Sequence, residues 1–130
     1  DIAYRLLTNT DFPSWGYMIK NGATTIWERW DGYTEEKGFQ DKGMNSFNHY
    51  SLGSVGEWLY GTVGGIKPSS PGFKEILIAP QPGGDLKWVK TSYNSNYGTI
   101  AVDWTRDGNK FVMNVVVPPN TTAKIIFPGN

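Results

Sequence analysis

The feature that most constrains this chain is a change of hydrophobic period at residues 67–72, which read KPSSPG. Before this segment apolar residues recur at helical spacing, and after it they alternate with polar residues as strands do. Two prolines, two serines and a glycine cannot continue a helix. The sequence therefore predicts two parts, a helical one over residues 1–66 and a β-unit over residues 67–130.

The first predicted helix lies in the stretch NTDFPSWGYMIKNG, residues 9–22, which follows a short helical stub. Thr10 or Asp11 is expected to cap it, and Asn21-Gly22 is expected to give its left-handed exit. Its predicted apolar face consists of Phe12, Trp15, Met18 and Ile19.

A second helix is predicted over residues 48–66, with Asn48 as its cap and Gly64-Gly65 at its end. Its apolar stripe is Leu52, Val55, Leu59 and Val63. Its interior glycines are Gly53, Gly56 and Gly61. Each interior glycine costs about 1 kcal/mol relative to alanine. We expect another backbone or a ligand to approach closely where that cost is accepted.

The second part contains five strand candidates and no helix. They cover residues 73–80, 86–94, 97–108, 110–118 and 122–128. The sequence RDGN at residues 106–109 is a hairpin signal between the third and the fourth. Short strands separated by such turns predict an antiparallel β-sandwich.

Composition excludes several classes of function. Twelve basic residues balance twelve acidic ones, so no electrostatic argument favours nucleic acid or an anionic membrane as a partner. No run of 18 apolar residues is present, so no membrane-spanning helix is predicted. With no cysteine and one histidine, the chain lacks thiolate and multi-imidazole metal sites, and we predict neither a metal nor a cofactor. Localisation is left open.

Residues 23–30, ATTIWERW, read as an extended segment because threonine, isoleucine and tryptophan favour strands. Glu28 lies between Trp27 and Trp30, so it is either a charge on a solvated face or a carboxylate in an aromatic pocket. Aromatic rings stack on the apolar face of a pyranose, while carboxylates and imidazoles bond its hydroxyls. Glu28 and His49, 21 residues further on, would suit such a sugar site, although pattern alone favours a surface charge and a helix-start histidine.

The segments GATTIWERWDG and MNSFNHYSLGSVGEWLYGTVGGI together closely resemble the end of the catalytic domain in glycoside hydrolase family 78, the bacterial and fungal α-L-rhamnosidases. That family has an (α/α)6 barrel followed by a C-terminal β-sandwich. The resemblance implies an α+β fragment, with the last barrel helices in residues 1–66 and an antiparallel β-sandwich in residues 67–130. It also implies a rhamnose-containing glycoside or polysaccharide as the substrate.

Roles for single residues follow from the same resemblance. Glu28 matches the family's general base and His49 a residue that hydrogen-bonds the rhamnose, while Trp27 and Trp30 match flanking aromatic residues. The family inverts the anomeric configuration, so Glu28 would activate a water about 6.5–9.5 Å from a second carboxyl that acts as the acid. The family's general acid lies upstream of this segment, so the fragment alone is expected to be inactive.

Two other interpretations stay open. The chain could be a non-catalytic carbohydrate-binding β-sandwich module, for which Trp88, Trp104, Tyr93 and Tyr97 would have to form a flat exposed strip. It could also belong to another (α/α)6 glycoside hydrolase.

The apolar helix faces of an isolated fragment would be exposed, and exposed aromatic patches favour association. We therefore expect either self-association through Trp15, Trp27 and Trp58 or disorder in residues 31–47.

Overall fold

The computed structural model describes residues 2–129, and the chain forms two compact units that meet between Val55 and Gly56. Residues 56–66, which the sequence assigned to the helical part, belong to the same compact unit as residues 67–130. The domain boundary predicted between residues 66 and 67 stays a prediction. No helix in the described part of the chain has the length and apolar character needed to cross a membrane.

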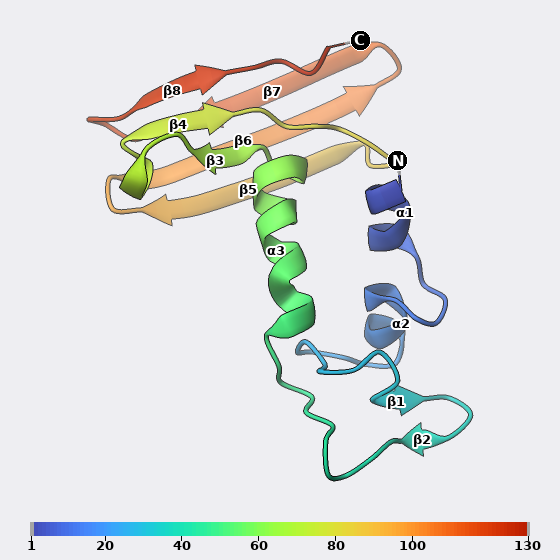
Figure 1. Cartoon of the computed structure of the whole chain (residues 1–130). Coiled ribbons are helices and arrows are strands. Elements are labelled where there is room, and N and C mark those ends of the chain that lie inside the picture. Colours follow the sequence, from blue (N-terminus) through green and yellow to red (C-terminus); the bar gives the residue numbers. More distant parts are fainter. Residues whose placement is uncertain (1, 130) are drawn as a thin grey trace. The chain divides into compact units, whose positions relative to one another are not determined.

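The first unit consists of short elements joined by irregular backbone (Figure 1). They are α1 (Ile2–Thr8), α2 (Trp15–Lys20), β1 (Tyr33–Thr34), β2 (Gly38–Phe39) and the 3-10 turn η1 (Ser51–Ser54). Strands β1 and β2 pair as an antiparallel hairpin within residues 31–47, so this segment has defined backbone structure and the expected disorder is wrong. Self-association stays a prediction.

Helix α2 begins later than the sequence predicted. Its cap is Ser14, whose hydroxyl accepts a hydrogen bond from the Tyr17 amide at 2.9 Å, and not Thr10 or Asp11. Asp11 is instead held in a local turn, because its amide donates to the side chain of Asn9. The predicted exit is confirmed, since Gly22 has a φ of 83°.

The second predicted helix is an irregular helical run (Figure 1, green). After η1 it continues as α3 (Val55–Trp58) and then as the π-turn η2 (Leu59–Val63). The predicted Asn48 cap is wrong, because the run starts at Ser51 without a side-chain cap. The predicted glycine end is confirmed: the Gly64 amide donates to the Leu59 carbonyl at 2.8 Å, and Gly65 has a φ of 81°.

The second unit is a β-sandwich of two three-stranded sheets (Figure 1). One sheet has the order β3 (Ile66–Pro68), β4 (Glu75–Ile78), β8 (Thr122–Ile125). The other has the order β5 (Trp88–Ser95), β6 (Gly98–Asp107), β7 (Lys110–Val116). A short 3-10 turn, η3 (Pro71–Phe73), joins β3 to β4.

All five predicted strands are present, and the predicted β6–β7 hairpin pairs Asp107 with Lys110 across a two-residue turn. Two features differ from the prediction. Strand β3 was missed, and β4 pairs with β8 in parallel, so the sandwich is not wholly antiparallel.

The hydrophobic core lies between the two sheets. It is built from Ile66, Ile76 and Ile78 of one sheet and Ile100, Val102 and Trp104 of the other. The Trp104 indole donates to the Val63 carbonyl at 2.9 Å, which ties the π-turn to the core. Of the interior glycines, Gly61 shows the expected close approach, since an added Cβ would lie 3.0 Å from Lys67 Cε, whereas Gly56 has nothing within 4 Å. A closer approach occurs at Gly64, where an added Cβ would lie 2.4 Å from Thr91 Oγ1.

Candidate active site around Glu28

Residues 23–30, which the sequence predicted as extended, form bends and a turn with no ladder partner. Two separated backbone bonds fix the segment to residues 46–49. The Glu28 amide donates to the Ser46 carbonyl, and the His49 amide donates to the Ile26 carbonyl, each at 2.8 Å. The Thr25 hydroxyl also donates to the Phe47 carbonyl. These contacts bring the two motifs of the sequence side by side within the first unit.

Glu28 is anchored at both its backbone and its side chain. The Ser46 amide donates to Glu28 Oε2 at 2.8 Å, which makes the Glu28–Ser46 contact reciprocal. No hydrogen-bond donor to Oε1 is found among residues 2–129. Because the residue is only partly buried, one carboxylate oxygen is fixed and the other can reach a ligand or water.

His49 lies beside this segment and is partly exposed. Its Nδ1 accepts a hydrogen bond from the Ser51 amide at 3.3 Å, and its ring stacks on Tyr50 with centroids 5.1 Å apart. A neutral imidazole that accepts at Nδ1 carries its proton on Nε2. His49 can therefore offer a donor to a ligand, and the expectation of a helix-start histidine also agrees with the Ser51 contact.

The two tryptophans that flank Glu28 lie in different surroundings. Trp27 is 5% exposed and packs edge-to-face on Phe47 with centroids 5.2 Å apart. Trp30 is partly exposed and packs edge-to-face on Trp15, also at 5.2 Å. Trp27 thus stabilises the segment from beneath, whereas Trp30 keeps some ring surface accessible.

The ion-pair partner of Arg29 is Asp31. It makes a two-point contact with Asp31, with N···O distances of 2.9 and 3.0 Å. This hydrogen bond and the opposite charges lower the pKa of the Asp31 carboxyl and raise the pKa of Arg29. The pair therefore stabilises the fold above the ordinary pKa of aspartate, and this contribution is lost as the pH falls through the lowered pKa. It is small, because the side chains are 38% and 43% exposed.

Asn45 is a structural contributor that the sequence did not reveal. Its Nδ2 donates to the carbonyls of Gly32 and Gln40, at 2.9 and 3.0 Å. This orientation leaves Oδ1 buried without a partner among the described residues, and a Cβ added at Gly32 would lie 2.7 Å from it. Asn45 thereby links two points of the loop that precedes Ser46.

We predict that Gly32→Ala loosens this loop. The new methyl group would displace the Asn45 amide and its two hydrogen bonds, each worth about 1 kcal/mol. Amide hydrogen exchange over residues 38–47, followed by mass spectrometry, should become roughly ten-fold faster. Gly43→Ala is the matched control, since its Cβ would meet only Asp41 Oδ1, at 3.4 Å. Equal exchange in the two variants would contradict the role of Asn45.

The four β-unit aromatic residues that a flat sugar platform would need do not lie on one surface. Trp104 is 1% exposed, in the core, while Trp88 is 64% exposed. Trp88 and Tyr93 lie on opposite faces of β5, because they are five positions apart along the strand. Tyr97 lies in the β5–β6 turn, where Lys74 Nζ is 5.2 Å from its ring centroid.

Within residues 2–129, no group of three or more His, Cys, Asp or Glu side chains could hold a metal ion. The chemistry that the Glu28 segment offers is that of a carboxylate, an imidazole and indole rings. A carboxylate with one oxygen fixed can accept a proton from a bound water, and an imidazole donor can orient a hydroxyl.

Comparison with known protein families divides the chain in two. Residues 65–130 match the family model of the bacterial alpha-L-rhamnosidase C-terminal domain. Residues 1–63 match the model of the bacterial alpha-L-rhamnosidase 6 hairpin glycosidase domain. The boundary between the two matches therefore falls at Gly64-Gly65, the glycine pair that ends the helical run.

Individual relatives agree with these matches. An alpha-L-rhamnosidase of Streptomyces avermitilis is 46% identical over 130 residues, all of this chain but 13% of the relative. One from Formosa agariphila is 47% identical over 128 residues, 98% of this chain and 14% of the relative. The chain thus spans only about a seventh of the length of these relatives.

The solved structures that the chain resembles are also alpha-L-rhamnosidases. The Streptomyces avermitilis alpha-L-rhamnosidase complexed with L-rhamnose matches with a TM-score of 0.90 and 47% identity, over 96% of this chain and 12% of that one. The Aspergillus terreus enzyme matches with a TM-score of 0.92 and 41% identity, over 98% of this chain and 15% of that one.

Proposed function

The chain belongs to the bacterial α-L-rhamnosidase family, and we propose on this basis that it is the C-terminal part of an enzyme that removes terminal α-L-rhamnose from glycosides or polysaccharides. The relatives that it matches carry the name alpha-L-rhamnosidase, which is a glycoside hydrolase activity. In this proposal residues 1–66 close the catalytic barrel and residues 67–130 form the sandwich domain that follows it.

Glu28 acts as the general base in this proposal. The observation that supports it best is the reciprocal Glu28–Ser46 contact, which fixes Oε2 and leaves Oε1 without a partner among residues 2–129. Oε1 would take a proton from a water, whose oxygen then attacks the anomeric carbon while an acid outside this chain protonates the leaving oxygen. The configuration at that carbon would be inverted.

The residues beside Glu28 would hold the sugar. His49 Nε2–H would donate to a rhamnose hydroxyl, because Nδ1 already accepts from Ser51. The accessible part of the Trp30 ring would contact the apolar face of the sugar. Trp27 would act mainly through the packing of the segment, since it is 5% exposed.

The anomer of the first product tests the proposed mechanism. We expect the intact enzyme to release β-L-rhamnose from 4-nitrophenyl α-L-rhamnopyranoside, as proton NMR of the anomeric signal would show before mutarotation. Accumulation of the α-anomer would require a covalent intermediate and a closer carboxyl pair, and would rule out the role proposed for Glu28.

A further inference from the structure

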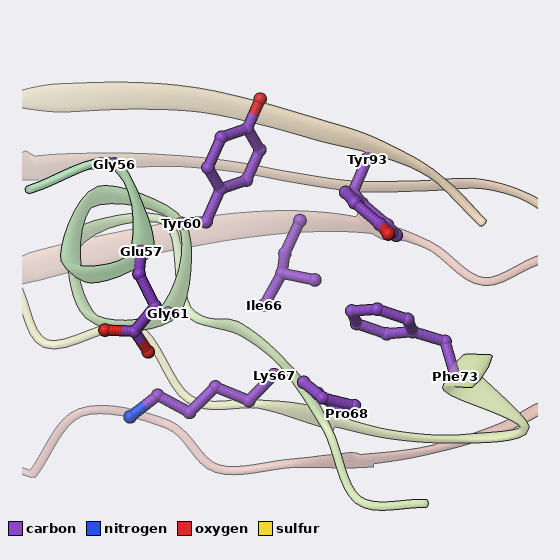
Figure 2. A pocket seen from close by; sticks show the side chains of 9 residues that line it. All are labelled: Gly56, Glu57, Tyr60, Gly61, Ile66, Lys67, Pro68, Phe73 and Tyr93. Atoms are coloured by element: carbon purple, nitrogen blue, oxygen red, sulfur yellow. The ribbon is translucent and has the colours of Figure 1, made fainter. Parts of the chain in front are cut away.

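The second unit contains a pocket of about 350 Å³ that the Glu28 site does not use (Figure 2). Its size lies at the lower end of the roughly 300–1,000 Å³ typical of ligand pockets. The lining residues come from the helical run, β3, η3 and β5, and those used below are Gly56, Glu57, Tyr60, Lys67, Phe73 and Tyr93.

Aromatic rings form the walls of this pocket. The rings of Phe73 and Tyr93 lie 4.6 Å apart at 36°, and that of Tyr60 stands at 80° to Tyr93, with centroids 6.4 Å apart. Phe73 and Tyr93 form one wall of the pocket, and Tyr60 forms a second wall nearly perpendicular to Tyr93. Tyr60 and Tyr93 stay 47% and 40% exposed, so they keep ring surface and hydroxyl groups available to a ligand.

Charged groups lie at the opposite end. Figure 2 shows the Glu57 carboxylate and the Lys67 ammonium on the same side of the pocket, away from Phe73. No ion pair or hydrogen bond between these two side chains occurs in the described part of the chain. One acceptor group and one donor group are thus available beside an apolar corner.

Three departures from regular structure meet at this pocket. Gly56 places a poor helix former inside α3, and an added Cβ there would meet nothing within 4 Å. The π-turn of η2 carries Tyr60, and such turns are common at functional sites. Phe73 has a φ of 64°, which is strained for a bulky residue. Each departure costs stability, and each either opens the pocket or places one of its rings, as expected of a functional site.

We propose that this pocket binds a neutral pyranoside, a second sugar site separate from the Glu28 site. The ring face of the sugar would lie against Phe73 and Tyr93, and its hydroxyls would bond Glu57, Lys67 and the Tyr60 hydroxyl. The choice of a rhamnoside as the ligand rests on the proposed function. An enzyme that binds one glycan at two points raises the effective concentration of its substrate.

The test counts sites by isothermal titration of methyl α-L-rhamnopyranoside into the intact Glu28→Gln protein, where turnover is suppressed. Within the residues of this chain the parent offers two sites, one at Glu28 and one at this pocket. Adding Gly56→Leu should remove one, because its side chain enters the open space at Gly56 and leucine is the better helix former. Tyr93→Ala should remove the same site. Trp88→Ala, an exposed aromatic outside the pocket, should leave two.

The difference in stoichiometry between parent and Gly56→Leu reports this pocket, and the remaining site reports Glu28 and His49. Failure of the proposed function alone would remove the Glu28 site from both counts and keep the difference between the parent and Gly56→Leu at one site. Equal stoichiometry in the parent and both pocket variants would overturn the proposal. Loss of a site in Trp88→Ala would also overturn the proposal, because the sugar would then bind to exposed aromatic side chains in general and not to this pocket.

Discussion

Glu28→Gln in the intact enzyme should lower kcat for an aryl α-L-rhamnoside by about 10²–10⁴-fold, the usual effect of removing a general base. KM should change by only a few-fold. Glutamine has nearly the shape of glutamate, and its carbonyl oxygen can still accept from the Ser46 amide, so the segment keeps its geometry. Only the proposed proton acceptor for water is lost. Steady-state kinetics on 4-nitrophenyl α-L-rhamnopyranoside would measure both constants.

Two controls accompany this variant. Glu36→Gln removes an exposed carboxylate from the neighbouring loop and should leave kcat unchanged. The 130-residue chain by itself should show no turnover, because the proposed mechanism takes the acid that protonates the leaving oxygen from outside this chain. A kcat of Glu28→Gln within a few-fold of the parent would show that another group is the base.

The elements that the sequence predicted well are those stabilised by local contacts. The β6–β7 hairpin needs only the turn at Gly108 and the alternation on either side of it. Strand β3 was missed because KPSSPG reads as a boundary, yet Pro68 is tolerated at the end of an edge strand that pairs only with β4. The parallel β4–β8 pairing joins residues 75–78 to residues 122–125, and no local pattern encodes it.

In the candidate site, too, the features that depend on contacts between distant residues could not be predicted from the sequence. The aromatic residues beside Glu28 were visible in the sequence, but the irregular conformation of its segment was not. Backbone hydrogen bonds to the distant residues Ser46 and His49 fix that conformation. The hydrogen-bonding role of Asn45 could not be predicted either, since an asparagine in a polar loop usually indicates only a turn. For Gly56 the sequence predicted that something approaches closely, and the structure has open space there, which is what a ligand would need.

The sandwich unit depends on Trp104, and Trp104→Ala should lower the free energy of unfolding by about 3–5 kcal/mol, the range for a buried large aromatic residue. The side chain is 1% exposed and lies 5.8 Å from the Phe111 ring, centroid to centroid. Its removal opens a cavity between the sheets and leaves the Val63 carbonyl without its indole donor. Urea unfolding of the chain, followed by circular dichroism, would measure the change.

Two further variants separate packing from hydrogen bonding at this position. Trp104→Phe keeps most of the buried ring but removes the indole N–H, so it should cost about 1–3 kcal/mol for the unsatisfied Val63 carbonyl and the smaller ring. Trp88→Ala, on the adjacent strand β5 and 64% exposed, should stay within about 0.5 kcal/mol of the parent. A Trp88 variant as unstable as Trp104→Ala would mean that Trp88 is buried against another surface in solution, and that the core lies elsewhere than between these two sheets.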